Sequence, residues 1–242
     1  MGFHSFLQKN RIPLESVMAK SWNKKIFKQI DEKVNQASKD FAEERGACPD
    51  AAEYGFKERF SNKTAIAPTA SISIICGGAS PGVEPVAANS YTHKTLSGSY
   101  NVRNRYLRKI LEKHNKDNDE VWSSITTNQG SVSHLEFLTD HEKDVFKTAF
   151  ELDQKWIIEL GADRTPYVSQ AQSINIFLPA DVHKKELHQI HFQAWKKGLK
   201  SLYYCRSKSI QRAENINNGL SVNKLEDESS EEKNYEECLS CQ

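Results

Sequence analysis

Two cysteines near the end of the chain, Cys238 and Cys241, have the spacing CxxC, which suits reversible thiol chemistry. Two thiols at this spacing can close into a disulfide and exchange it with another disulfide. Zinc binding is the alternative, but a structural zinc ion needs four ligands, and no second pair of Cys or His lies near this pair. The neighbouring Glu236 and Glu237 disfavour thiolate formation, which fits a relay of reducing equivalents better than a strong nucleophile.

The second candidate is an almost uncharged stretch, residues 67–85, which combines proline, small hydroxyl residues and glycines. Proline suits the first helical position, a neighbouring Thr or Ser can cap a helix, and free backbone N–H groups at a helix start attract phosphate. The stretch matches neither GxxxxGK[ST] nor GxGxxG. From the residues alone, a capped turn that binds no ligand is the alternative.

The third candidate is a pair of adjacent tyrosines, Tyr203 and Tyr204, in the apolar and aromatic segment 199–205, which predicts a strand. Two tyrosines on a strand ordinarily pack in a core or at a sheet edge.

Three segments, in the correct order, resemble the large subunit of class I ribonucleotide reductases: APTASISIICGGASPGVEP, QSINI and GLKSLYY. The resemblance runs from Gly2 to Gln242, and the CxxC ending resembles class Ia members from bacteriophages. In that family the first segment holds the substrate diphosphate through backbone N–H and hydroxyl groups. The resemblance therefore implies a phosphate site at Pro68, Thr69, Ala70, Ser71, Ile72 and Ser73.

The same resemblance implies roles for the other two candidates. In that family the adjacent tyrosines relay a radical into the active site, so Tyr203 and Tyr204 are the expected relay, and phenol oxidation with proton loss suits them to it. Cys238 and Cys241 are expected to shuttle reducing equivalents by thiol exchange. Ile72 departs from the family pattern, because many members have a hydroxyl residue there, so only its backbone would contribute.

The family's Asn-x-Cys-x-Glu motif, which carries the thiyl radical, is missing from these 242 residues. The resemblance therefore implies a C-terminal portion of the large subunit, encoded as its own chain in a split subunit. Its expected activity is the reduction of ribonucleoside diphosphates to deoxyribonucleoside diphosphates by a radical mechanism. The expected partners are the N-terminal part of the large subunit, the small subunit, a thioredoxin- or glutaredoxin-like reductant and the substrate.

No cofactor is expected on this chain. The resemblance implies a diiron-tyrosyl radical in the small subunit, and ATP or dNTP effectors on the missing large-subunit part. Two alternatives remain. One is a non-enzymatic phosphate-binding or regulatory subunit derived from the reductase. The other is a thiol-disulfide carrier, which lacks the strand-CxxC-helix pattern of thioredoxins.

The expected fold class is α/β: residues 1–206 form the C-terminal part of the reductase's ten-stranded α/β barrel, completed by another chain. Residues 207–242, polar and then acidic, are expected to form a flexible redox tail. About 30 residues then separate the last strand from the CxxC pair, and they span roughly 30 Å as a coil and on the order of 100 Å when extended. Either length lets the pair visit both a buried pocket and an external reductant.

Several elements are expected to position these candidates. An apolar stripe over 15–45 predicts a core-facing helix. A helix at 103–113 is expected to turn Leu107, Ile110 and Leu111 inward, and residues 128–130 carry a turn signal. Thr139 and Glu142 have capping-box spacing at the start of a helix expected over 139–161, and Asp181 is expected to cap a helix that ends at Gly198. Residues 173–178 predict a strand, so the last third reads as strand-helix-strand, typical of a parallel α/β layer. The stripe comprises Met18, Trp22, Ile26, Ile30, Val34, Ala37 and Phe41.

Composition excludes several classes of protein. The net charge of +1 gives no reason to expect nucleic-acid binding. No apolar run approaches the roughly 18 residues of a membrane span, and the N-terminus has no signal-peptide pattern. Five scattered cysteines, an odd number, argue against a disulfide framework. The expected location is therefore the cytoplasm, of a host cell if the protein is viral.

Overall fold

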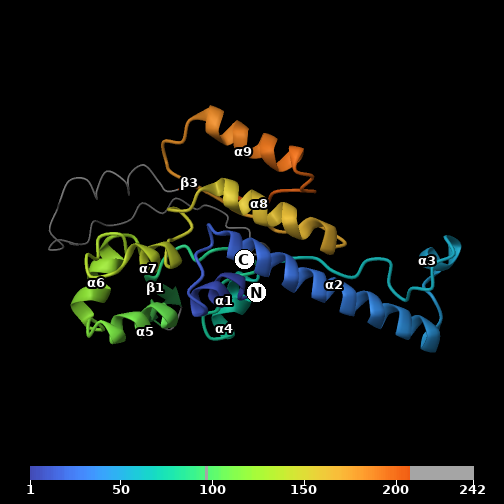
Figure 1. Ribbon diagram of the computed structural model, residues 1–242, viewed down its shortest axis with the longest axis horizontal. Helices are drawn as coiled ribbons and strands as arrows, with labels where there is room; N and C mark the ends of the chain where they lie inside the picture. The colour runs from blue at the N-terminus through green and yellow to red at the C-terminus, as the bar shows by residue number, and fades with distance from the viewer. Residues whose placement is uncertain (96–97, 208–242) are drawn as a thin grey trace.

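The computed structural model describes residues 1–95 and 98–207, and Figure 1 shows an elongated arrangement of helices with few strands. The helices are α1 (Phe3–Lys9), α2 (Val17–Arg45), α3 (Pro49–Glu53), α4 (Ala70–Ile75), α5 (Arg105–Lys113), α6 (Asp119–Thr127), α7 (Asp140–Val145), α8 (Gln154–Arg164) and α9 (Lys184–Lys196), with a 3-10 turn at Thr165–Tyr167. The strands are β1 (Ser90–Thr95), β2 (Gly98–Arg103), β3 (Ile176–Leu178) and β4 (Cys205–Ser207).

The strands pair in two ways. β1 and β2 form an antiparallel hairpin in which Ser90 pairs with Arg103. β3 and β4 pair in parallel, with Ile176 opposite Cys205, and α9 connects them. The predicted parallel strand-helix-strand unit is therefore confirmed, although its second strand begins at Cys205 and not at Leu199.

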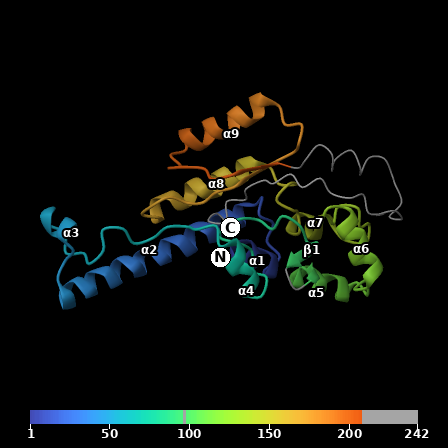
Figure 2. The same cartoon turned by 180° about the vertical axis from the view of Figure 1, so that it is seen from behind.

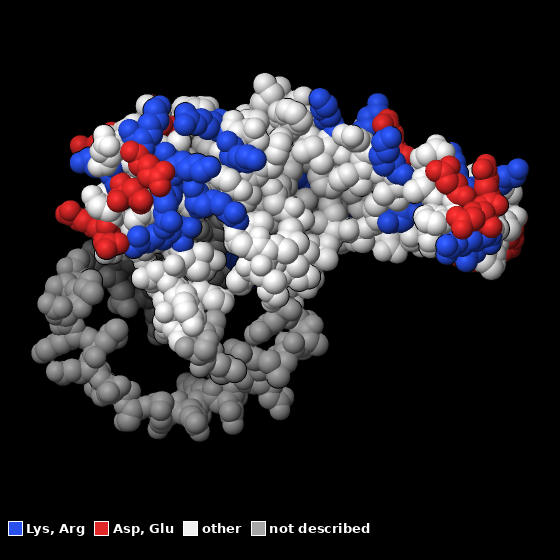
Figure 3. Space-filling view, turned by 90° about the horizontal axis from the view of Figure 1, so that it is seen from below, with Lys and Arg blue, Asp and Glu red and all other residues white. Residues whose placement is uncertain are grey.

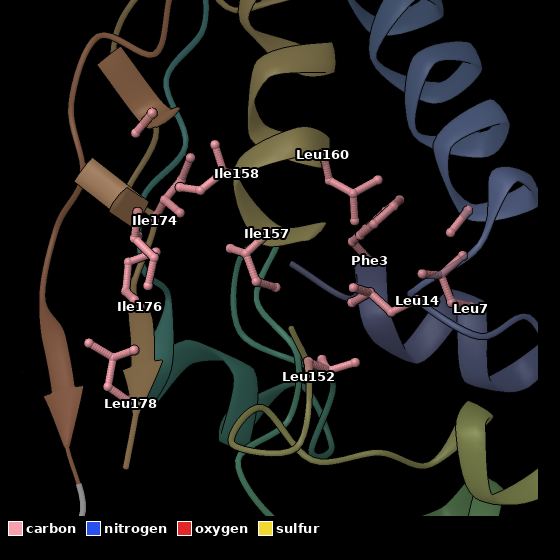
Figure 4. Packing of buried hydrophobic residues seen from close by; sticks show 13 residues of the cluster. Phe3, Leu7, Leu14, Leu152, Ile157, Ile158, Leu160, Ile174, Ile176 and Leu178 are labelled. Atoms are coloured by element: carbon pink, nitrogen blue, oxygen red, sulfur yellow. The ribbon is translucent and has the colours of Figure 1, made fainter. Parts of the chain in front are cut away.

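The larger hydrophobic core lies between α8, the segment 172–178, and the N-terminal helices (Figure 4). Segment 172–178 ends in β3 and is called the strand line below. In Figure 4 the side chains of α8 lie in the middle, with those of residues 174–178 on one side and those of α1 on the other. Its fully buried members include Leu7, Ile158 and Leu178. This core fixes the strand line against which the tyrosine pair and the phosphate stretch lie.

A second core holds α5, α6 and α7 together at one end of the molecule. The predicted inward face of the 103–113 helix, Leu107, Ile110 and Leu111, is buried as expected. Trp122 of α6 is 1% exposed in the same cluster. The predicted turn at 128–130 ends α6, where Gly130 has a φ of 80°.

The long helix α2 projects away from the body and carries α3 beyond its far end (Figures 1 and 2). The expected helix is confirmed, but the expected core contact of its stripe holds only near its start, where Trp22 packs on Phe6 with ring centroids 5.3 Å apart. Met18, Ile30 and Phe41 are exposed. Beyond its first turns α2 has few neighbours in the described part of the chain, so most of the stripe has nothing to pack against.

The single helix predicted over 139–161 is wrong, because α7 and α8 are separate. The predicted capping box is present: Thr139 Oγ1 accepts from Glu142 N (3.2 Å), and Glu142 Oε2 accepts from Thr139 N (3.0 Å). After Val145 the chain bends, and Asp153 caps a new helix by accepting from Lys155 N (2.9 Å). The apolar pattern in the sequence continues across the bend, because the loop residues between α7 and α8 also bury apolar side chains in the cores.

Two predicted helix boundaries also differ. Gly161 does not end α8, because the helix continues to Arg164. A Cβ at Gly161 would lie 2.7 Å from Ile174 Cδ1, so this glycine allows close helix-strand packing. α9 is capped by His183 and not by Asp181, since His183 Nδ1 accepts from Lys185 N (3.1 Å).

Charged side chains gather at the two ends of the face shown in Figure 3, with mostly uncharged surface between them. Both signs occur in each group, and in the left-hand group the Lys and Arg atoms form a larger connected area than the Asp and Glu atoms. None of the described helices is both long and apolar enough to cross a membrane.

Candidate functional site

The predicted phosphate stretch forms a turn and the short helix α4. The helix begins at Ala70, so the prediction that Pro68 takes the first helical position is wrong. Thr69, with a φ of 54°, adopts a left-handed backbone conformation that separates Pro68 from the helix. Its hydroxyl does not cap α4 but accepts a hydrogen bond from Gly82 N (2.7 Å). Thr69 is therefore tied to the glycine-rich end of the same stretch.

The other residues of the stretch differ in what they offer a ligand. Ser73 is buried, its hydroxyl donates to Ala70 O (2.6 Å) and its backbone N–H donates to Thr69 O (2.9 Å). Both donor groups of Ser73 are thus engaged in the helix. Ser71 and Ile72 are exposed, and no side chain caps the helix start. The geometry therefore favours the first turn of α4, ahead of Ser73, as the part that faces a ligand.

The glycines after α4 are required by close approach of the chain. Gly82 has a φ of 47°, and a Cβ there would lie 3.0 Å from Ala67 O. Any other residue would be strained and would push the two halves of the stretch apart. Gly77 O accepts a hydrogen bond from the Arg105 guanidinium, which links the end of α4 to α5.

The helix α1 is hydrogen-bonded to this stretch and to Val86, which follows it. Ser5 and Ser80 exchange hydrogen bonds, from Ser5 N to Ser80 Oγ (3.1 Å) and from Ser80 N to Ser5 Oγ (2.8 Å). His4 Nδ1 accepts from Val86 N (3.0 Å), so its proton lies on Nε2. Burial lowers the pKa of His4 to about 4, so the imidazole is neutral at physiological pH.

The two tyrosines directly precede β4. Their ring centroids are 4.2 Å apart at an interplanar angle of 56°, and both rings are about two-fifths exposed, at 43% for Tyr203 and 42% for Tyr204. Tyr203 N donates to Ile174 O (2.8 Å), and Tyr204 O accepts from Ile176 N (2.9 Å). Of the two kinds of packing expected from the residues alone, a core position is excluded, and both tyrosines lie partly exposed beside β3 and the residues before it.

The phosphate stretch approaches the same strand line from its other edge. Ile66 forms a parallel bridge with Gln172, in which Ile66 N donates to Ala171 O and Ile66 O accepts from Ser173 N. Tyr203 N, in contrast, donates to Ile174 O. Backbone groups of alternate residues in a strand point to opposite edges, so the two candidates flank one segment. The bridge at Ile66 lies directly before the phosphate stretch, and Ile174, which Tyr203 binds, is two residues beyond the bridged Gln172. The structure thus brings together two candidates that are separated by more than a hundred residues in the sequence.

Three residues near these candidates were not singled out from the sequence: Glu84, Asn175 and Arg206. Glu84 and Asn175 are buried, and Asn175 Oδ1 accepts from Tyr204 N (3.0 Å). The Arg206 guanidinium lies 5.8 Å from the Tyr204 ring centroid. Burial raises the pKa of Glu84, while hydrogen bonding from Asn175 and the charge of Arg206 lower it. Glu84 and Asn175 fall within the segments that carry the family resemblance, which was the available signal.

The remaining expected residues, Cys238 and Cys241, lie outside the described residues. Cys48, Cys76 and Cys205 are free thiols. Within residues 1–95 and 98–207, no three His, Cys, Asp or Glu side chains come together as metal ligands. A cavity of about 680 Å³ between the starts of α8 and α9 contains none of the expected site residues.

The parallel unit of β3, α9 and β4, bridged to a third extended segment at Ile66, places the chain in the α/β class. Residues 50–205 match the family model described as "Ribonucleotide reductase, barrel domain". The chain therefore belongs to the ribonucleotide reductase large-subunit family, and the expected barrel fold is confirmed.

Similar proteins come from viruses and from cells. The "Ribonucleoside-diphosphate reductase large subunit" of Invertebrate iridescent virus 6 is 47% identical over 229 residues, which are 93% of this chain and 24% of the relative. The putative large subunit of Frog virus 3 is 38% identical over 242 residues, covering 100% of this chain and 41% of the relative. The large subunit of Danio rerio is 30% identical over 279 residues, covering 96% and 35%.

A solved structure has the same fold. The "Actinobacillus ureae class Id ribonucleotide reductase alpha subunit" superposes with a TM-score of 0.80 at 41% identity, covering 86% of this chain and 38% of that one. The chain thus spans between about a quarter and two-fifths of the length of these relatives. The expected class Ia, bacteriophage-like subtype stays a prediction.

Proposed function

We propose that this chain supplies three parts of a ribonucleoside-diphosphate reductase large subunit: the substrate phosphate site, the last tyrosine relay and the thiol-exchange tail. The reaction reduces the 2′ position of a ribonucleoside diphosphate by a radical mechanism. The observation that supports this most directly is the pairing of segment 172–174, which binds Ile66, directly before the phosphate stretch, on one edge and Tyr203 on the other. A substrate held at one edge would then lie near an oxidisable phenol at the other.

In this proposal the substrate diphosphate binds at the turn before α4. The backbone N–H groups of Ala70, Ser71 and Ile72 donate to phosphate oxygens, and the Thr69 and Ser71 hydroxyls add to the site. Pro68 shapes the turn, and Ser73, whose donors are engaged, holds the helix in place. The site is assembled by the Thr69–Gly82 hydrogen bond before substrate arrives.

Tyr203 and Tyr204 carry the radical toward the substrate. Each phenol loses an electron and a proton when oxidised and regains both when it passes the radical on. Ring centroids 4.2 Å apart put the two phenols in contact, which suits a short transfer between them. The thiyl radical itself forms on a cysteine outside these 242 residues.

The tail completes the cycle. Reduction of the substrate converts two cysteine thiols of the large subunit into a disulfide. A thiolate of the Cys238/Cys241 pair attacks that disulfide, the second thiol resolves the mixed disulfide, and a thioredoxin- or glutaredoxin-like protein then reduces the pair. Two electrons and two protons pass at each exchange, so the cycle balances.

The proposed assembly has further components. The rest of the barrel and the sites for ATP or dNTP effectors come from large-subunit sequence outside these 242 residues. The small subunit supplies the diiron-tyrosyl radical. Exposed apolar side chains support a missing covering layer, among them Met18, Ile30, Phe41, Phe56 and Phe60. The assembly is proposed to act in the cytoplasm.

The test uses the reconstituted assembly, with the chain mixed or co-expressed with the remaining large-subunit sequence and the small subunit. Tyr203→Phe or Tyr204→Phe should keep the ring and the fold but abolish turnover, because the oxidisable hydroxyl is lost. Tyr54→Phe, which changes an exposed tyrosine in the loop after α3, is the matched control and should turn over normally. Wild-type turnover in either relay variant would assign that tyrosine to packing. Diphosphate binding without any turnover by the wild-type assembly would favour the non-enzymatic binding subunit.

A further inference from the structure

Glu84 is a buried carboxyl group that the proposed reaction does not use. It is 8% exposed, and its Oε1 atom has no hydrogen-bond partner within the described part of the chain. An apolar side chain would fill the same space without the free-energy cost of burying a polar group. Packing alone therefore does not explain the carboxyl group at this position.

Asn175 connects Glu84 to the tyrosine pair. The side chain of Asn175 is 1% exposed, and its Oδ1 atom accepts the backbone N–H of Tyr204 (3.0 Å). Because the oxygen of this amide faces Tyr204 N, the amide NH2 is left to donate elsewhere. Asn175 also acts on the Glu84 carboxyl group: burial raises the pKa of Glu84, while hydrogen bonding from the side chain and the backbone N–H of Asn175 lowers it.

Glu84 also belongs to the tight turn that holds the phosphate stretch. Glu84 N donates to Pro81 O (3.0 Å), and within the same turn Gly82 N donates to Thr69 Oγ1 (2.7 Å). Val83 packs against the larger core. The turn 81–84 therefore binds Thr69, at the other end of the phosphate stretch, through the Gly82 backbone, and it faces Asn175 through the Glu84 side chain.

We propose that Glu84 is a positioning residue that fixes the phosphate stretch and the tyrosine pair relative to each other, through Asn175. The inference rests on the proposed function for those two parts. Gly82 N donates to Thr69 Oγ1, Gly82 and Glu84 share one short turn, and the buried Asn175 connects the Glu84 carboxyl group with Tyr204 N. Loss of the acceptor at Glu84 frees the Asn175 amide to turn, and both ends of the connection then lose their fixed geometry.

The variants separate hydrogen bonding from shape and charge. Glu84→Met keeps the length of the side chain but removes the acceptor, whereas Glu84→Gln keeps an acceptor oxygen. Asn175→Asp places a second carboxylate against Glu84, and these like charges repel. In the double variant Glu84→Gln with Asn175→Asp, donor and acceptor are exchanged. The new amide at position 84 can then donate to the new carboxylate at position 175, whose other oxygen still accepts from Tyr204 N. Glu58→Met, which alters a carboxylate between α3 and the 60–64 segment, is the matched control.

In the reconstituted assembly, Glu84→Met and Asn175→Asp should each raise KM for a ribonucleoside diphosphate and lower kcat, by about tenfold in kcat/KM, the size expected for one buried hydrogen bond. Glu84→Gln should stay near wild type, and the double variant should recover most of the loss of Asn175→Asp. Glu58→Met should change neither constant. Thermal unfolding of each variant identifies any that merely fails to fold.

A second measurement does not depend on activity. Hydrogen–deuterium exchange of peptides covering residues 203–206 and 69–73 should accelerate together in Glu84→Met and return toward wild type in the exchanged double variant. Unchanged exchange in Glu84→Met, or acceleration in only one of the two peptides, would overturn the connection. If the wild-type assembly has no turnover but exchange responds as expected, the connection stands and the proposed function fails. Wild-type kinetics in a folded Glu84→Met variant would overturn the positioning role.

Discussion

His4 holds a neutral imidazole inside the structure, and its state ties the stability of the phosphate stretch to pH. The ring is completely buried and accepts Val86 N, so protonation would both charge a buried group and remove this acceptor. The pKa of His4 is about 4 in the folded chain, against an ordinary value of 6.5. The unfolded chain therefore binds the extra proton first as pH falls.

We predict that the His4 contribution to stability is fully present above pH 6.5 and is lost as pH falls toward 4, by at most about 1.4 kcal/mol per pH unit. His4→Asn keeps an acceptor oxygen near Val86 N but cannot take up a proton in this range. Urea denaturation between pH 7 and 5 should show a smaller loss of stability in His4→Asn than in the wild type. Equal slopes for the two proteins would contradict the prediction.

At the residue scale, the two tyrosines and Glu84 show opposite departures from their usual surroundings. Adjacent tyrosines that could pack in a core are exposed, whereas a carboxyl group that could face water is buried. Both departures occur along the same short strand line, next to Asn175. Such departures concentrate where a fold serves chemistry and not stability alone.

The elements around the site depend on a few glycines that allow close approach. Gly130, at the end of α6, has a φ of 80°, and a Cβ there would lie 2.3 Å from Ala88 Cβ and 2.6 Å from Ala88 Cα. Gly130 O also accepts from Asn89 N (3.1 Å) and Asn89 Nδ2 (3.0 Å). This contact fixes the segment that leads from the Glu84 turn into β1.

We predict that Gly130→Ala lowers the free energy of unfolding by about 3 kcal/mol or more, because backbone strain adds to a clash with the backbone at Ala88. Gly198→Ala is the control, since Gly198 also has a positive φ (78°) but has no atom within 4 Å of the added Cβ. It should lose only about 1 kcal/mol. Denaturant titration measures the free energy of unfolding of both variants. A similar loss of stability in the two would show that backbone strain alone, without the clash at Ala88, determines the effect.

For the whole molecule, the tail pair is the part whose proposed role requires movement between partners. Exchange needs both thiols, since one attacks and the other resolves the mixed disulfide. A protein reductant is too large to enter the active site, whereas dithiothreitol is small enough. In the proposed role, the tail is therefore needed with a protein reductant but not with dithiothreitol.

We predict that Cys241→Ser in the reconstituted assembly loses steady-state turnover with a thioredoxin-like reductant but keeps much of it with dithiothreitol. The fully reduced variant should still complete a first turnover. Cys205→Ser, which removes an exposed thiol of β4, is the control and should support turnover with both reductants. Equal loss of turnover with both reductants in Cys241→Ser would indicate that the tail has a structural role. Full activity with both reductants would contradict the thiol-exchange role of the pair.

Local sequence determined the elements whose signals lie within a few residues. The capping box at Thr139, the inward face of α5, the turn at Gly130 and the parallel β3–α9–β4 unit all follow from short-range pattern. The family resemblance was likewise readable, because the motifs that carry it are short and occur in order.

Only the tertiary structure decided what lies next to these elements. The apolar stripe of α2 predicts a buried face, but burial needs a partner surface, and beyond Ile26 and Phe27 the described chain offers little. The sequence does not reveal the break between α7 and α8, because the loop residues between them continue the apolar pattern of a helix and are buried in the cores. The meeting of Thr69, Glu84, Asn175 and Tyr204 depends on strand register, and register is set by backbone pairing between segments far apart in the sequence.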